Sequence, residues 1–318
     1  HLATAEAIYD GPANNLVGIQ TFSGGKDSAS PQHAVLLGMS GAGKSVTVCD
    51  LLSQTEGYFG YTVIIEEGLS YGIYTATVEE GARPIIIHPD GDLTINYLDT
   101  KGLPLTPDHL SAATALVARM IGTSTQEDKQ MLRQAQIAKY LNLLYEDSFQ
   151  DWQKKRHDQL LNIARHAMAL QKFRAEKMPP GATTLESFAD FRDWKATHVD
   201  EAQSYMQQFA EADTLRFLKD PKTSKEVRNL AFAHFTPDEF PTHRMLQELM
   251  MLDPIGAERD QIMEIATLIL PWCRDGNYGC LFDGTSNLSL TGKIAHFELG
   301  YIPESAKELK AAAGFLIT

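Results

Sequence analysis

The eight residues from Gly38 to Ser45 (GMSGAGKS) have the types and spacing of a phosphate-binding loop. They fit the pattern G-x-x-x-x-G-K-[ST] at every fixed position, which a chain of this length matches by chance roughly 1% of the time. The glycines allow the backbone to wrap closely around a phosphate with its N–H groups pointing inward. We therefore predict that Lys44 contacts the β- and γ-phosphates of ATP and that the Ser45 hydroxyl ligates Mg²⁺.

The segments on either side of this loop are predicted to position it. His33–Leu37 is short and largely apolar, as expected for a buried parallel strand, and a helix is predicted from Ser45 to Gln54. The positive end of that helix would point at the same anion. The predicted nucleotide contacts lie in the loop and the first helical turn: Ser40, Gly41, Ala42, Gly43, Lys44, Ser45 and Val46.

A second candidate group lies at the end of the next predicted strand, Tyr61–Ile65, where Glu66 and Glu67 follow. A carboxylate at this edge, beside a phosphate loop, could polarise water or hold magnesium, so Glu66 joins Lys44 as a predicted catalytic residue. The alternative is that these acids end a strand simply by meeting solvent.

Three other groups favour structural roles. His88–Asp92 contains possible metal ligands, but its Pro-Asp-Gly sequence is typical of a turn. The basic cluster Lys154–Arg156 has acidic neighbours and favours a solvated helix face over a nucleic-acid or partner contact. Trp152, Phe188 and Trp194 are more typical of a core than of stacking platforms.

The elements divide the chain into three predicted parts. Residues 1–100 alternate strands with helices, including a third strand at Pro84–Ile87, which predicts a parallel sheet. Residues 101–275 are predicted to be almost entirely helical. From 276 the strand character returns, with a turn-rich edge at Tyr278–Gly284, a strand at Ile294–Glu298 and a helix from near Glu304.

Helix starts within the middle part are predicted from capping residues. Thr106 precedes a proline, which suits the first helical position. In a capping box, a Ser or Thr side chain accepts a hydrogen bond from the amide three residues later, and the Glu side chain there accepts one from the Ser or Thr amide. This spacing occurs at Ser124/Glu127, Thr183/Glu186 and Thr236/Glu239. The sequence Met178–Gly181 is predicted to break the helices.

Composition excludes some classes of protein. The 318 residues are 43% hydrophobic, enough for a substantial core, yet no apolar stretch approaches the roughly 20 residues of a membrane-spanning helix. Three cysteines without metal-ligand spacing favour a reducing, cytoplasmic setting. A formal charge of −13 argues against broad attraction to nucleic acid.

Four stretches, taken in order, resemble a known family. They are GMSGAGKSVTVCDLLSQ, then YTVIIEEGLSYG, then, after the helical part, YGCLFDG and IAHFELGYIP. The chain resembles the motor domain of TraC/TrbE-type ATPases, the conjugation and type IV secretion ATPases of the VirB group within the HerA/FtsK superfamily. The expected fold is α/β: a RecA-like P-loop NTPase core with a mostly parallel sheet and a large all-α insertion.

The resemblance implies ATP hydrolysis with Mg²⁺, coupled to pilus assembly or substrate transfer. It also implies a self-assembled hexamer, cytoplasmic and peripherally attached to the inner membrane with other secretion-channel subunits, and a nucleic-acid or protein substrate. Glu66 matches a position where Asp is commoner in the family. Because the Walker B Asp-Glu of the family would follow Ile294–Glu298, we expect a C-terminally truncated core that hydrolyses ATP weakly or not at all.

Three alternatives remain at this point. One is a DNA translocase of the HerA type, which shares the fold and would show DNA-stimulated turnover. Another is a nucleotide-regulated scaffold whose helical insert is the working surface, and which would keep partner binding after Lys44→Ala. A P-loop kinase would transfer phosphate to a small acceptor, and no lid or acceptor-site pattern in the sequence favours it.

Overall fold

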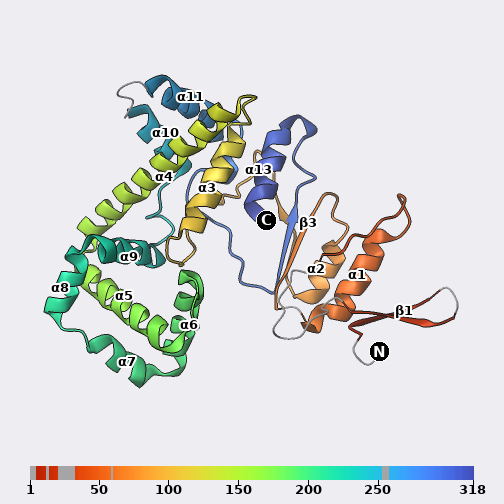
Figure 1. Cartoon of the computed structure of the whole chain (residues 1–318). Coiled ribbons are helices and arrows are strands. Elements are labelled where there is room, and N and C mark those ends of the chain that lie inside the picture. Colours follow the sequence, from red (N-terminus) through yellow and green to blue (C-terminus); the bar gives the residue numbers. More distant parts are fainter. Residues whose placement is uncertain (1–4, 12–13, 21–32, 59, 253–257) are drawn as a thin grey trace. The chain divides into compact units, whose positions relative to one another are not determined.

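The computed structural model describes residues 5–11, 14–20, 33–58, 60–252 and 258–318, and the chain divides into two compact units (Figure 1). The sheet unit comprises His1–His88 and Ser289–Ser305, and the helical unit comprises Pro89–Leu288 and Ala306–Thr318. We expected divisions after residues 100 and 275, and the structure divides the chain after residues 88 and 288. The last helix, α13, groups with the helical unit.

The sheet unit contains a three-stranded parallel sheet. Its strands are β3 (Thr62–Glu66), β4 (Ile85–Ile86) and β5 (Ile294–Glu298), in the order β3-β5-β4. The strand that arrives last in the chain thus lies between the other two, and all five of its residues are buried. The predicted parallel strands at 61–65, 84–87 and 294–298 are confirmed, with β4 shorter than expected.

Two helices of the sheet unit contribute to its core. These are α1 (Lys44–Thr55), followed by the 3-10 turn η2 (Glu56–Tyr58), and α2 (Gly72–Val78). Cys49 and Leu52 of α1 pack against a buried cluster of Ile64, Tyr74 and Ile294. The helix that follows the glycine loop is therefore fixed to β3 and β5. A separate antiparallel hairpin, β1 (Ala7–Asp10) and β2 (Leu16–Ile19), precedes it.

The helical unit is built from helices of very different length, drawn from yellow to blue in Figure 1. They are α3 (Pro107–Met120), α4 (Glu127–Lys155), α5 (His157–Lys177), α6 (Thr184–Thr197), α7 (Val199–Gln207), α8 (Glu211–Lys219), α9 (Pro221–Ala231), α10 (His243–Leu252), α11 (Arg259–Ile269), α12 (Gly279–Phe282) and α13 (Lys307–Ile317), with short 3-10 turns η3 (Phe232–His234) and η4 (Leu270–Trp272). A further 3-10 turn, η5 (Glu304–Ala306), spans the division between the two units. Aromatic residues dominate its core, and Tyr140, Tyr145, Phe191, Phe232 and Phe282 are almost fully buried. Trp152 and Phe188 are buried and Trp194 packs beside Phe173, which confirms the predicted core role.

Several predicted elements were wrong. His33–Leu37 forms no strand, and Val35 and Leu37 are 83% and 87% exposed, because no described strand pairs with this segment. The predicted turn-rich edge at Tyr278–Gly284 contains the short helix α12. Of the predicted capping boxes, the one at Thr183/Glu186 is complete and the other two start no helix.

Candidate functional site: the glycine loop and the strand-end carboxylates

The loop 38–45 has the backbone form of an anion-binding turn. Gly41 and Gly43 have φ angles of 79° and 83°, in the left-handed region that only glycine occupies without strain. Because a Cβ at either position would meet no atom within 4 Å, the requirement for glycine is conformational and not a matter of space. The Ala42 amide donates to the Met39 carbonyl at 3.2 Å and closes the turn.

Lys44 folds back over this turn. Its Nζ atom donates to the carbonyl oxygens of Gly38 and Met39, each at 2.9 Å. Both partners are neutral acceptors, so the ammonium charge has no carboxylate in contact with it among the described residues. A stronger, anionic acceptor placed in the loop would compete well for this group.

The N-terminus of α1 points its unpaired amides toward the same loop. No side chain caps this end and the first turn holds no acidic residue, so its N–H groups and the helix dipole are left for an anion. Ser45 is half-buried and Val46 is 73% exposed, which places Val46 on the outer side of the first turn. These features fit a nucleotide triphosphate group, with the Ser45 hydroxyl in the first helical turn as the candidate ligand of Mg²⁺.

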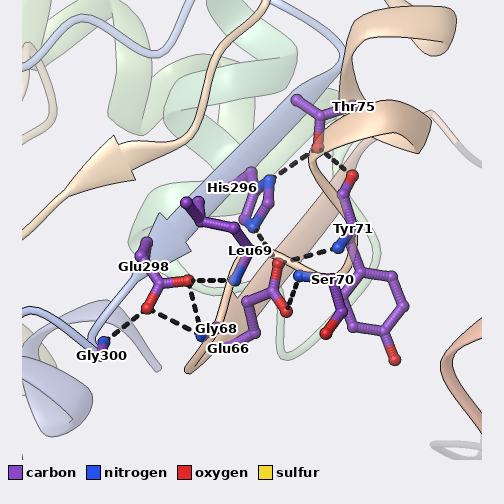
Figure 2. Close-up of polar contacts among 9 residues, drawn as sticks. All are labelled: Glu66, Gly68, Leu69, Ser70, Tyr71, Thr75, His296, Glu298 and Gly300. Atoms are coloured by element: carbon purple, nitrogen blue, oxygen red, sulfur yellow. Dashed lines mark hydrogen bonds and ion pairs between the residues drawn. The ribbon is translucent and has the colours of Figure 1, made fainter.

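Glu66 lies at the carboxyl end of β3, where the sequence predicted it, but its carboxylate is already occupied. It accepts hydrogen bonds from the amides of Ser70 (2.8 Å) and Tyr71 (2.9 Å) and from Nε2 of His296 (2.7 Å), as Figure 2 shows. The side chain is 7% exposed. A carboxylate with three donors and little solvent contact is suited to holding a loop in place.

His296, on the central strand, connects Glu66 to α2. Because a carboxylate only accepts, Nε2 of His296 carries the proton that it shares with Glu66. On its other side, Nδ1 lies 2.7 Å from the hydroxyl of Thr75, and the same hydroxyl oxygen lies 3.1 Å from the Tyr71 carbonyl oxygen (Figure 2). His296 and Thr75 are each 1% exposed, so this chain of polar groups is sealed from water.

Glu298 holds the other half of the same loop. Its carboxylate accepts from the amides of Gly68, Leu69 and Gly300 (Figure 2). Burial alone would raise the pKa of Glu298, but these amides, with His296 nearby, hold it below its ordinary value. Leu69 has a φ of 58°, unusual for a residue with a Cβ, and the amide contacts with Glu298 support that conformation.

The two carboxylates therefore form one structure, which we call the loop clamp: Glu66, Glu298 and His296 holding residues 67–71. Sequence reasoning found Glu66 but missed His296, Glu298 and Thr75. The available signal was the pair of ionisable residues inside the apolar strand IAHFE, since a buried charge requires partners. In register, Glu66 lies opposite Glu298 at the same edge of the sheet.

Cys49 of α1 lies near the Glu66 carboxylate of the loop clamp. Burial, followed by the nearby Glu66 carboxylate, raises the pKa of the Cys49 thiol, which keeps it protonated, and its side chain packs against the buried cluster of the sheet unit. Cys49 lies in the second turn of α1, the helix that begins at the glycine loop.

The remaining candidates have structural roles. Pro89 and Asp90 form a turn, and no group of three or more His, Cys, Asp or Glu side chains in the described part of the chain is arranged to hold a metal ion. Lys154 pairs with Asp151 and Arg156 with Glu239, as expected for a solvated helix face. Among the helices that the structure describes, none is both long enough and apolar enough to cross a membrane.

Comparison with known proteins gives a structural likeness. No protein-family model matches the chain, and no curated protein matches it in sequence. The solved structure of VirB4 of Thermoanaerobacter pseudethanolicus superposes with a TM-score of 0.53 over 96% of this chain, at 14% sequence identity. The chain spans 60% of the length of that structure. At this identity the likeness establishes the fold: an α/β core with a small parallel sheet and a large helical part, as predicted.

Proposed function

We propose that this chain is the ATP-binding motor portion of a type IV secretion ATPase of the VirB4 kind. The observation that carries the proposal is the glycine loop, in which two left-handed glycines, an uncapped helix N-terminus and the Lys44 ammonium converge. The fold likeness to VirB4 supports the choice among P-loop proteins. Membership of the TraC/TrbE branch, assembly as a hexamer, attachment to a secretion channel at the inner membrane and coupling to pilus assembly or substrate transfer are parts of the same proposal.

Binding would proceed through groups of the glycine loop and the first turn of α1. Lys44 exchanges two neutral carbonyl acceptors for phosphate oxygens, and this charge-assisted contact is the stronger one. The amides from Gly41 to Ser45 donate to the same phosphates, and the Ser45 hydroxyl is the protein ligand for magnesium. When bound, ATP with Mg²⁺ would supply the phosphoanhydride bond whose cleavage drives the motor.

Hydrolysis needs a carboxylate or equivalent group that can orient water. Glu66 and Glu298 each already accept hydrogen bonds from three protein donors. We therefore assign Glu66 to positioning of the 67–71 loop, and propose that the chain alone binds ATP but turns it over slowly.

The test is nucleotide affinity, measured with a fluorescent ATP analogue in the presence of Mg²⁺. Lys44→Ala removes the charge on the phosphates, and we expect affinity to fall at least about tenfold, roughly 1.4 kcal/mol. Lys293→Ala is the matched control, because Lys293 is an exposed lysine of the same unit outside the loop; its affinity should change less than about twofold. Equal affinity of the unchanged protein, Lys44→Ala and Lys293→Ala for the ATP analogue would contradict the proposal.

A further inference from the structure

A groove in the helical unit runs along both sides of the segment Pro104–Pro107. On one side lies a cavity of about 420 Å³ between α5, α6 and α9, walled mainly by apolar side chains such as Leu105, Leu170 and Leu230. On the other side lies a cavity of about 510 Å³ between α3, α4 and α9. Thr106, Pro107 and Asn229 line both, so the two cavities adjoin. We call them the apolar cavity and the basic cavity, and together the α9 groove.

The wall between the cavities is rigid. Its two prolines fix their own φ angles, the Leu105 amide donates to the Asn229 carbonyl at 2.9 Å, and the Thr106 side chain caps α3 by accepting from the His109 amide. The groove is therefore formed in the protein as it stands, and binding there would not first have to order the wall.

The basic cavity carries an uncompensated positive charge. Its charged lining residues are Lys225 and Arg228, and the described lining contains no carboxylate. Arg228 forms an ion pair with Glu146, whereas the Lys225 side chain is exposed and its ammonium group forms no ion pair or hydrogen bond with any part of the chain that the structure describes. In a protein with a net charge of −13, such a cation in a cavity favours an anionic group.

The apolar cavity has the opposite character. Arg174 donates to the Ala182 carbonyl and Gln171 to the Glu226 carboxylate, so its polar rim is largely satisfied internally. An apolar side chain inserted there would bury surface without leaving those groups unpaired. Glu226 on this rim would repel a second carboxylate, which restricts an acidic group to the Lys225 side.

We propose that the α9 groove binds an extended peptide segment of a partner protein, with one apolar side chain in the apolar cavity and an Asp or Glu carboxylate beside Lys225. Neighbouring side chains on one face of an extended chain are two residues and about 7 Å apart, so two anchors that enter adjoining cavities belong about two residues apart. A nucleic acid fits less well, because among the described residues no aromatic side chain lines either cavity to stack a base and only Lys225 is free for phosphates.

The experiment is selection of a random seven-residue peptide library on the whole chain, followed by fluorescence polarisation of the selected peptide. We expect enrichment of Leu, Ile or Phe within two residues of Asp or Glu. Ala175→Trp, which fills the apolar cavity from an exposed position, and Lys225→Glu should each weaken binding about tenfold or more. Raised salt should weaken binding to the unchanged protein.

Matched controls are Ala196→Trp on α6 and Lys222→Glu on α9, both exposed and outside the two cavity linings; binding should stay within about twofold. Thermal unfolding of each variant shows that it folds. The proposal is overturned if no motif is enriched, if the motif is basic, if a 12-nucleotide single-stranded DNA competes for the groove, or if folded groove variants bind like the controls. None of these outcomes depends on the glycine loop, so the proposed ATP binding would stand or fall separately.

Discussion

At the scale of single residues, the carboxylate of Glu298 is buried and surrounded by backbone amides. Glu298 is 0% exposed, and its ionised carboxylate is stabilised by hydrogen bonds from the amides of Gly68, Leu69 and Gly300. Since its pKa in the folded protein is lowered, the stabilisation is present above the ordinary value of 4.5 and is lost as pH falls through the folded value. The ionised form is thus the one that holds the 67–71 loop.

Glu298→Gln should reduce the free energy of unfolding by about 1.5–3 kcal/mol, because a neutral amide replaces a charged acceptor and brings an additional donor to the same amides. Urea unfolding measures the loss, and hydrogen exchange at Gly68 and Leu69 should accelerate. Glu56→Gln is the control, since Glu56 is an exposed acid of the same unit. Equal stability of the two variants would mean that the loop clamp contributes nothing.

At the scale of helices and strands, side-chain hydrogen bonds at the helix starts show why one predicted capping box is correct and two are wrong. The Thr183 hydroxyl accepts from the Glu186 amide, and the Glu186 side chain accepts from the Thr183 amide, so α6 begins as predicted. The Ser124 hydroxyl instead accepts from the Gln126 amide, and the Ser124 amide donates to the side-chain oxygen of Gln130. Helix α4 therefore begins later, at Glu127. The spacing alone does not distinguish these two arrangements.

The third predicted cap fails for a different physical reason. Glu239 does accept from the Thr236 amide at 2.8 Å, but Pro241 follows shortly and disfavours helical backbone at the residue before it. Only a turn forms there. The spacing therefore predicted the Thr236–Glu239 hydrogen bond correctly, but Pro241 prevents a helix from continuing after it.

Thr183→Ala should lower the stability of the helical unit by about 1 kcal/mol, because one capped amide of α6 loses its acceptor. Ser124→Ala is the matched change at a serine with similar spacing that caps no helix, and a loss of only a few tenths of a kcal/mol is expected. Circular dichroism during urea unfolding compares the two. A larger loss at Ser124 would contradict the assignment of the helix starts.

The sequence predicts site residues that are adjacent in the chain better than residues that meet only in the folded protein. The glycine loop is a continuous sequence motif, so its residues could be named from the sequence. His296 and Glu298 reach Glu66 because β5 inserts between β3 and β4 after the whole helical unit has intervened. Nothing in the local sequence specifies that strand order, and the function of these two residues is visible only once it is known.

At the scale of the whole molecule, buried neutral histidines make stability depend on pH. Burial lowers the pKa of His166 to about 3, with Lys195 and His234 adding to the effect, and burial lowers that of His243 to about 4. Neutral His243 is satisfied by the Tyr97 hydroxyl and the Ile269 carbonyl. Below the ordinary value of 6.5 the unfolded chain binds protons that the folded protein does not, so folding is disfavoured.

We therefore expect the free energy of unfolding to fall as pH decreases from 6.5 to 5, by up to about 2 kcal/mol for each of these two histidines. His243→Gln should flatten this dependence, although it also lowers stability at neutral pH. His157→Gln, at an exposed position, should leave the slope unchanged. Unfolding at a series of pH values provides the test, and parallel curves for all three proteins would contradict it.

The most direct test of the central claim observes the glycine loop itself while nucleotide is added. Backbone amide resonances of Gly41, Gly43, Lys44 and Ser45 are followed by NMR during titration with Mg²⁺ and ATP, and separately with adenosine. The account predicts that these four amides shift strongly with ATP and hardly at all with adenosine, because they contact phosphate. Shifts confined to other regions, or equal shifts with adenosine, would contradict it.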